Sequence, residues 1–110
     1  MAVIIKTQNP SELLKKIKKA IDENTVRSWS YDKDGDFTHD AEQWKDEAWL
    51  RPKTYTGELR LGIVAPKDTK LSSQIYGLYH GRFIDMVLTH FDSEFTMASA
   101  TAGKTDPDTF

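Results

Sequence analysis

The sequence predicts an α+β fold: a two-layer sandwich in which two helices cover one face of a curved, mainly antiparallel sheet. Three observations support this prediction. The stretch 72–91 is long, apolar and free of proline, and residues 55–64 alternate between apolar and polar side chains. Short turn sequences separate several other strand-like segments. Strands joined by short turns pair antiparallel, and two amphipathic helices then bury their apolar sides on one face of the sheet.

The composition is that of one ordinary folded domain. The chain has 110 residues, of which 38% are hydrophobic and 11% aromatic, enough for one core. We expect a single domain over residues 1–102. The polar segment 103–110 predicts a disordered C-terminal tail.

Charge and cysteine content narrow the classes of function. The net charge of −2 argues against broad nucleic-acid binding, which requires a basic surface. The chain has no cysteine, which removes disulfides and zinc–thiolate sites and is typical of a reducing compartment. The opening MAVIIK is too short for a signal peptide, and no run reaches the roughly 20 apolar residues of a membrane span. We therefore predict a cytoplasmic protein without membrane contact.

The first quarter of the chain predicts a strand followed by a surface helix. Residues 2–7 are β-branched and apolar. Asn9 is a favourable N-cap and Pro10 suits the first helical position, so we expect a helix from there to about residue 23. Its apolar residues fall on one stripe and its lysines on the other side; the lysines are Lys15, Lys16, Lys18 and Lys19.

The middle of the chain changes to a period of two, which indicates strands. Residues 26–31 and 37–39 flank a turn of three aspartates and a glycine, so they predict a hairpin. Residues 40–47 are mostly polar and predict a turn or loop. We expect a strand over 48–51 that Pro52 limits, and the clearest strand over 55–64. Residues 95–102 predict a last strand.

The stretch 72–91 predicts the central helix, capped by Ser72 or Ser73. Its apolar side chains cover an arc of roughly 180°, so we expect that a curled sheet or a second chain shields most of it. Gly77 and Gly81 are one turn apart, which indicates the close approach of another backbone. That backbone belongs either to the first helix or to a partner's copy of this helix, which would make a homodimer. Arg82 and Asp85 have the spacing of a surface ion pair.

Residues 32–43 begin like a calcium loop but depart from the pattern. Asp32, Asp34 and Asp36 occupy the first, third and fifth places. Phe37 stands where the loop requires glycine, and Gln43 where it requires glutamate. We therefore interpret the segment as a hairpin turn and predict no metal site and no cofactor.

His80 is the first candidate for a general base, because it lies inside the apolar arc and partial burial tunes a histidine pKa. Tyr76, Tyr79 and His39 are its expected neighbours in a pocket. His90 is about 15 Å further along the helix axis, too far to share a ligand with His80. The alternative is a buried structural histidine that bonds to Tyr76.

Basic and aromatic residues predict a binding face on the sheet. The set is Arg27, Arg51, Lys53 and Arg60 with Trp29, Trp49 and Tyr55. Aromatic side chains beside arginines bind single-stranded bases or protein surfaces. The acidic net charge favours protein.

The sequence shows no phosphate-binding glycine loop, nucleophile elbow or His-Glu-x-x-His motif. Our leading hypothesis is therefore a non-catalytic protein-interaction or regulatory domain, which we expect to form a homodimer. The alternatives are a single-stranded nucleic-acid binder, and an enzyme or small-ligand binder with a pocket around His80.

Overall fold

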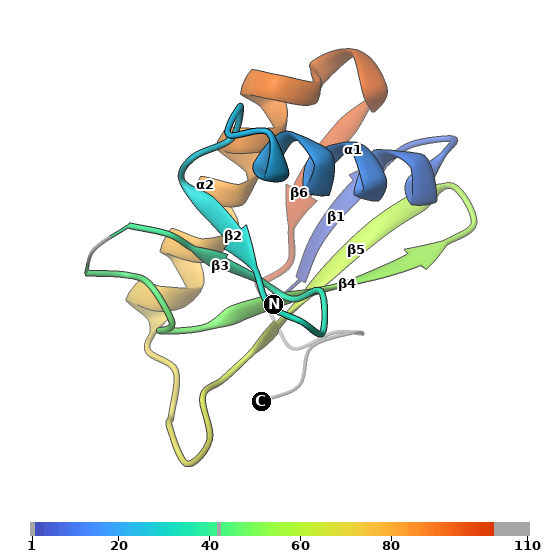
Figure 1. The fold of residues 1–110 in the computed structure, drawn as a ribbon. Helices are drawn as coiled ribbons and strands as arrows, with labels where there is room; N and C mark the ends of the chain where they lie inside the picture. The colour runs from blue at the N-terminus through green and yellow to red at the C-terminus, as the bar shows by residue number, and fades with distance from the viewer. Residues whose placement is uncertain (1, 42, 103–110) are drawn as a thin grey trace.

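The computed structural model describes residues 2–41 and 43–102, which form a six-stranded sheet with two long helices (Figure 1). The elements in chain order are β1 (Ala2–Lys6), α1 (Pro10–Asp22), β2 (Trp29–Tyr31), β3 (Phe37–His39), β4 (Trp49–Tyr55), β5 (Glu58–Val64), α2 (Ser73–Phe91), a 3₁₀ turn (Asp92–Glu94) and β6 (Met97–Ala100). All the strand pairs are antiparallel, so the predicted α+β sandwich is confirmed. The predicted tail, 103–110, lies outside the described residues.

The strand order is β2-β3-β4-β5-β1-β6. Strands β2 to β5 form a meander, and β1 lies between β5 and the last strand. The register sets Val3 opposite Leu61 and Ile5 opposite Leu59, which are all completely buried. Because side chains alternate along a strand, this register fixes one apolar face for the helices and leaves the other face for polar residues.

Both helices contribute to one core on that apolar face. Its centre is aromatic, because Trp29 packs edge-on against Phe83 at 5.1 Å between ring centroids and against Tyr79 at 5.7 Å. Phe37 completes the group 5.6 Å from Phe83. Edge-to-face ring pairs add about 0.5–1.5 kcal/mol each beyond the area they bury, so this group ties α2 to β2 and β3.

Helix α1 matches the prediction in position but not in its cap. Pro10 is the first helical residue, and Leu13 and Ile17 are buried. The side chain of Asn9 makes no capping hydrogen bond, contrary to the prediction, and only its carbonyl accepts from the N–H of Leu13 at 3.0 Å. The helix ends at Asp22, close to the predicted end.

The predicted strand 55–64 is wrong at its start. Residues Thr56 and Gly57 form a two-residue turn between β4 and β5, and Gly57 has a φ of +77°, which favours glycine. Strand β4 also continues through Pro52 to Tyr55, instead of ending at the proline. The proline is tolerated because β3 pairs with β4 only through the Phe37–Leu50 pair. No β3 carbonyl lies opposite Pro52 to accept a hydrogen bond from a backbone N–H.

Helix α2 is continuous, as predicted, and the hydroxyl of Ser72 accepts from the N–H of Ile75 at 3.2 Å. Helix α2 contacts β3 near one edge of the sheet and β1 and β6 at the opposite edge, so the sheet curls around the helix. The buried residues of α2 are Tyr79, His80, Phe83, Met86, Val87 and Phe91. No helix in the described ranges combines the length and the apolar character needed to cross a membrane.

The outer side of α2 is open to solvent. Gly77 and Gly81 are exposed, and apart from the neighbouring residues and backbone of α2 itself no described atom lies within 4 Å of the position that a Cβ would take at either residue. The prediction that α1 approaches these glycines is therefore wrong. Leu88, on the same side of the helix, is 52% exposed.

Candidate functional site

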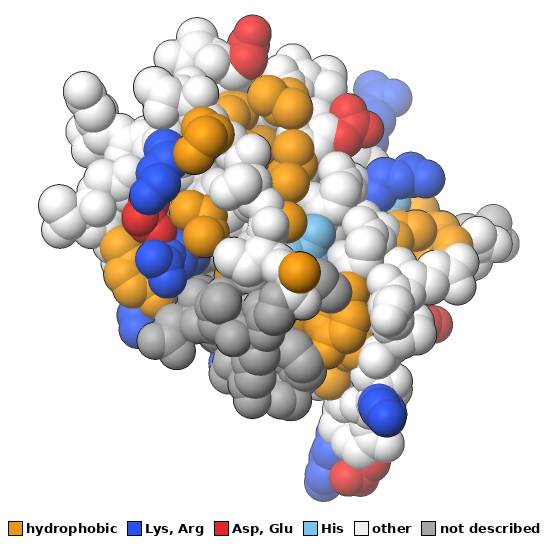
Figure 2. Space-filling model, turned by 180° about the vertical axis from the view of Figure 1, so that it is seen from behind, with side chains coloured by type: hydrophobic (Ala, Val, Ile, Leu, Met, Phe, Trp, Pro, Cys, Tyr) orange, Lys and Arg blue, Asp and Glu red, His pale blue; other side chains and the backbone are white. Residues whose placement is uncertain are grey.

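Four residues of β4 point away from the core, because every second residue of the strand does so. These residues are Trp49, Arg51, Lys53 and Tyr55, and they lie beside Arg60 of β5 and Lys6 of β1. We call these six residues the outer basic face. Seen from behind (Figure 2), basic, acidic and hydrophobic side chains intermix on the side of the molecule formed by the β4–β5 hairpin. No described helix covers this face.

Two residues of the predicted face lie elsewhere. Trp29 is only 2% exposed and belongs to the core, so its predicted role on the binding face is wrong. Arg27 precedes β2, and its Nε donates to the carbonyl oxygen of Asn24 at 3.2 Å. The prediction failed because β2 begins at Trp29, so the two-residue alternation does not extend back to Arg27.

Two buried carboxylates hold the cations of the outer basic face in place. Glu58, 9% exposed, accepts from Lys6 at 2.7 Å and from Arg60. Asp36, 4% exposed, accepts from two nitrogens of Arg51, at 3.0 and 3.2 Å. The hydrogen bonds from Lys6 and then Arg60 lower the pKa of Glu58, and the hydrogen bond to Asp36 raises the pKa of Arg51.

Two cations lie close to the ring of Tyr55, one from a residue before it in the sequence and one from a residue after it. The guanidinium of Arg60 lies 4.7 Å from its centroid, and the ammonium of Lys53 lies 5.4 Å from it. Both distances are within the range of cation–π attraction. The ring of Tyr55 therefore helps to position the charged groups of Arg60 and Lys53, and the side chain of Lys53 is exposed to solvent.

The aspartate-rich segment is a hairpin turn, as predicted. The carboxylate of Asp32 accepts from the N–H groups of Asp34 and Asp36, at 2.9 and 3.0 Å, and the carboxylate of Asp36 pairs with Arg51. Two of the three carboxylates thus serve the protein's own structure. Within the described ranges, no three histidine, aspartate or glutamate side chains gather where they would hold a metal ion.

His80 does not form the predicted group with Tyr79 and His39. Its Nδ1 lies 2.6 Å from the carbonyl oxygen of Tyr76, the residue is 3% exposed, and its Nε2 is buried without a hydrogen-bond partner. Tyr79 instead faces His39, with 6.3 Å between ring centroids. Neighbouring residues on a helix differ by about 100° in direction, which separates Tyr79 from His80. Tyr76 lines a different hollow, of about 400 Å³, with Lys70 and Leu71.

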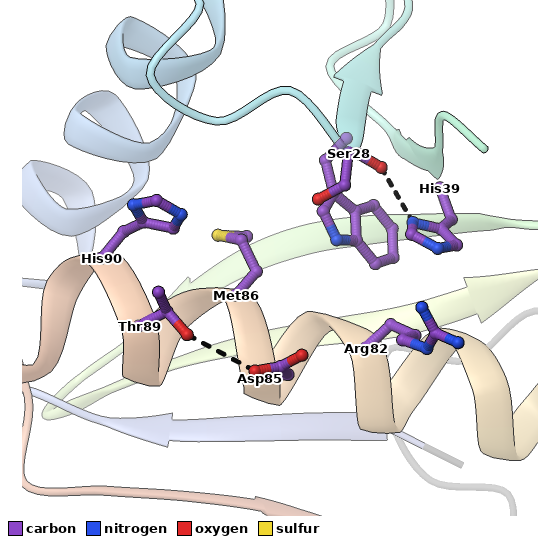
Figure 3. Close-up of a pocket in the computed structure, with 8 residues that line it drawn as sticks. Ser28, His39, Arg82, Asp85, Met86, Thr89 and His90 are labelled. Atoms are coloured by element: carbon purple, nitrogen blue, oxygen red, sulfur yellow. Dashed lines mark hydrogen bonds between the residues drawn. The ribbon is translucent and has the colours of Figure 1, made fainter.

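A second candidate site is a hollow of about 220 Å³ between α2 and the start of β2 (Figure 3). We call this cavity the α2 hollow. The residues that line it are Ser28, Trp29, His39, Arg82, Asp85, Met86, Thr89 and His90. His39 and His90 therefore share a site although 51 positions separate them in sequence. The sequence offered no signal for this pairing, because it depends on where the β2–β3 hairpin meets the helix.

His39 is the most buried polar residue of the α2 hollow, at 3% exposure. Its Nδ1 lies 2.8 Å from the carbonyl oxygen of Ser28, so Nδ1 carries the proton and Nε2 has the free lone pair. Nε2 has no hydrogen-bond partner. Burial lowers the pKa of His39 and nearby Arg82 lowers it further, against the opposing effect of the Ser28 hydrogen bond.

Arg82 and Asp85 do not form the predicted ion pair. The Oδ1 atom of Asp85 accepts from the hydroxyl of Thr89 at 3.4 Å, while Arg82 turns towards His39 (Figure 3). No salt bridge within 4.0 Å joins the two charged groups. The hollow thus has a separate positive and negative group on the same side of α2.

Comparison with models of known protein families, with curated proteins and with solved structures finds no match to this chain.

Proposed function

We propose that this protein is a non-catalytic interaction domain whose outer basic face binds an acidic segment of a partner protein. The observation that supports it most is the fixing of Arg51 and Arg60 by buried carboxylates. Donors held in one geometry lose little conformational entropy when a ligand binds. Lys53 is exposed and forms no ion pair with any described residue, so it adds a positive charge to the face, which favours an acidic ligand.

The aromatic residues of the face fit the same proposal. Trp49 is half-buried, and the ring of Tyr55 lies close to the cations of Lys53 and Arg60. Tryptophan, tyrosine and arginine contribute most of the binding energy at protein interfaces. An extended acidic peptide that carries apolar residues would contact both rings and cations along β4.

Single-stranded nucleic acid is the alternative ligand, and the ion pairs disfavour it. Binding to phosphates derives its strength from cations that exchange mobile counterions for the phosphate backbone. Three of the four cations on the face already pair with a carboxylate of the protein, namely Lys6, Arg51 and Arg60. Their contribution to phosphate binding is therefore reduced. The same pairing reduces the charge available to an acidic peptide, so the proposed peptide binding relies on the rings of Trp49 and Tyr55 and on hydrogen bonds to the fixed guanidinium groups.

The two ligands can be separated in one titration. We would add a soluble peptide that alternates glutamate and tyrosine, or an oligothymidylate of equal charge, to labelled protein at low salt and follow the backbone amides. We expect the peptide to shift the amides of β4 and β5 and to bind more tightly than the oligonucleotide. Tighter binding of the oligonucleotide would favour the alternative, and no binding of either would contradict both.

Two variants test the face itself. Lys53→Glu reverses a charge without breaking an ion pair, and we expect about tenfold weaker peptide binding. Lys67→Glu is the matched control, because Lys67 is also an exposed lysine that forms no ion pair within the described ranges, and it lies outside this face. Equal losses in both variants would show that only net charge matters.

Self-association through α2 stays a prediction. Gly77 and Gly81 leave an open surface, and exposed Leu88 lies on the same side. Sedimentation of the wild type and of Leu88→Lys tests it. A concentration-dependent dimer that the variant loses would support the prediction, and a monomer at all concentrations would exclude it. A cytoplasmic location likewise stays a prediction.

A further inference from the structure

We propose that the α2 hollow binds a small zwitterion of the α-amino acid type. Its carboxylate would pair with Arg82, and its ammonium would lie between Asp85 and Nε2 of His39. This site is separate from the outer basic face and does not depend on the function proposed above.

The first support is the separation of Arg82 from Asp85. At a spacing of three residues on an exposed helix these side chains would ordinarily approach each other. Here Asp85 bonds to Thr89, and Arg82 turns to the opposite side of the hollow (Figure 3). Two opposite charges that line one hollow without meeting match a ligand that carries an ammonium and a carboxylate on the same carbon atom.

The second support is the free nitrogen of His39, an independent observation. A buried polar atom without a hydrogen bond is costly. Among the described residues, Nε2 of His80 and the hydroxyl of Tyr55 are in the same state, and His39 is the one of these three residues that lines the α2 hollow. Because Nδ1 donates to Ser28, Nε2 can only accept. An ammonium group supplies the missing donor. In Figure 3 this nitrogen faces Arg82, so the exposed arginine must change rotamer to admit the ligand.

The size and the remaining lining of the hollow agree with such a ligand. A volume of about 220 Å³ is that of several water molecules, enough for a small amino acid. Trp29 and Met86 provide apolar surface for its side chain. The charges of Arg82 and Asp85 balance, so neither a simple anion nor a simple cation is matched as well as a zwitterion.

The test is a titration of labelled protein with the common L-amino acids, one at a time, followed by the backbone amides of residues 28, 29, 39 and 82–90. We expect at least one amino acid to bind at millimolar concentration or below and to shift these amides. Acetate lacks the ammonium and should bind at least tenfold more weakly. Glycine betaine keeps both charges but has no N–H, so it should bind at least tenfold more weakly than glycine.

Variants locate the binding. Arg82→Gln and Asp85→Asn change exposed residues and should each weaken binding about tenfold or more. His39→Asn keeps a donor near Nδ1 but removes the acceptor at Nε2, and should weaken binding as well. Lys67→Gln, an exposed position outside the hollow, should leave the affinity unchanged.

Three results would overturn the proposal: no amino acid shifts the amides of the hollow, glycine betaine binds as tightly as glycine, or Arg82→Gln and Asp85→Asn both keep the wild-type affinity. Arg82 and Asp85 are exposed, so the Arg82→Gln and Asp85→Asn variants should fold. They test the proposal even if His39→Asn does not fold.

Discussion

The hydroxyl of Tyr79 lies 3.0 Å from the hydroxyl of Thr38 and donates to the backbone carbonyl of Trp44. Thr38 in turn donates to the carbonyl oxygen of Ala48 at 3.0 Å and accepts from the N–H of Asp46 at 3.0 Å. One phenol on α2 therefore fastens the connection between β3 and β4 to the helix. Burial raises the pKa of Tyr79, so the hydroxyl keeps its proton at any physiological pH.

Tyr79→Phe should lower the free energy of unfolding by about 1–2 kcal/mol, because it retains the ring and leaves buried polar groups without a partner. Chemical denaturation measures the change. Tyr31→Phe is the matched control: it also removes a hydroxyl, but one that donates to the exposed carboxylate of Asp22 at 2.6 Å. We expect a smaller loss there, and equal losses would contradict the role of the Tyr79 network.

His39 makes stability depend on pH near neutrality. Its folded pKa lies below the ordinary value of about 6.5, mainly because of burial, so the unfolded chain binds the proton first. The free energy of unfolding should therefore fall as the pH drops below about 6.5, and this decline should stop below the folded pKa. Denaturation across this range, with proton resonances of the three histidines, measures both quantities.

His39→Asn provides the comparison for that pH dependence. It retains a donor towards Ser28 but has no group that titrates there, so it should lose most of the slope between pH 6.5 and the folded pKa. The charged or titratable side chains near His39 are those of Asp40, Arg82 and Tyr79. A slope that persists unchanged in the variant would assign it to another residue.

Glu58 should make stability depend on pH in the acid range. Its folded pKa lies below the ordinary value, so its contribution is complete above about pH 4.5 and is lost as the pH falls through the folded pKa. Glu58→Gln should cost about 1–2 kcal/mol at pH 7, because Lys6 and Arg60 lose a charged acceptor. Thermal unfolding at pH 7 and pH 3 tests this. An equal difference between variant and wild type at both pH values would contradict it.

The helix glycines give the clearest test of the open side of α2. Gly81→Ala should raise the free energy of unfolding by about 0.5–1 kcal/mol, because alanine is the better helix former and its Cβ meets no described atom. Gly35→Ala is the opposite case: φ is +84°, and Nζ of Lys18 lies 2.9 Å from the Cβ position. It should destabilise. A loss of stability in Gly81→Ala would mean that another surface covers this residue.

The sequence predicts the fold well where one local pattern decides it. The apolar arc of α2, the proline at the start of α1 and the aspartate turn each determine a local structure without help from distant residues. Thr56 and Gly57 show where this reasoning fails, because Tyr55 stands at an odd position like the leucines of β5 and so suggests one continuous strand. The structure instead pairs Tyr55 with Glu58 across a two-residue turn, which places Tyr55 on the outer face and Leu59 in the core. Gly57 was the residue in the sequence that could have indicated this turn.

The candidate sites were less predictable, because they depend on tertiary arrangement. Four residues of the outer basic face were predicted as a set from their residue types, and they share one face because they alternate along β4, a strand that the sequence prediction ended at Pro52. The α2 hollow joins residues near positions 28, 39 and 85, and only the docking of the hairpin on the helix brings them together. His80 was the preferred histidine because of its apolar neighbours, but those neighbours bury it instead of forming a site.

Pro52 has a consequence for the behaviour of the chain in concentrated solution. Counting from the Tyr55–Glu58 pair that closes the turn, Pro52 lies in a non-hydrogen-bonded pair with Leu61, so its nitrogen points away from β5. Strand β3 leaves this side of β4 unpaired beyond Leu50, which exposes a short sheet edge. A proline there cannot donate to an incoming strand, so the molecule resists edge-to-edge growth into aggregates at this position.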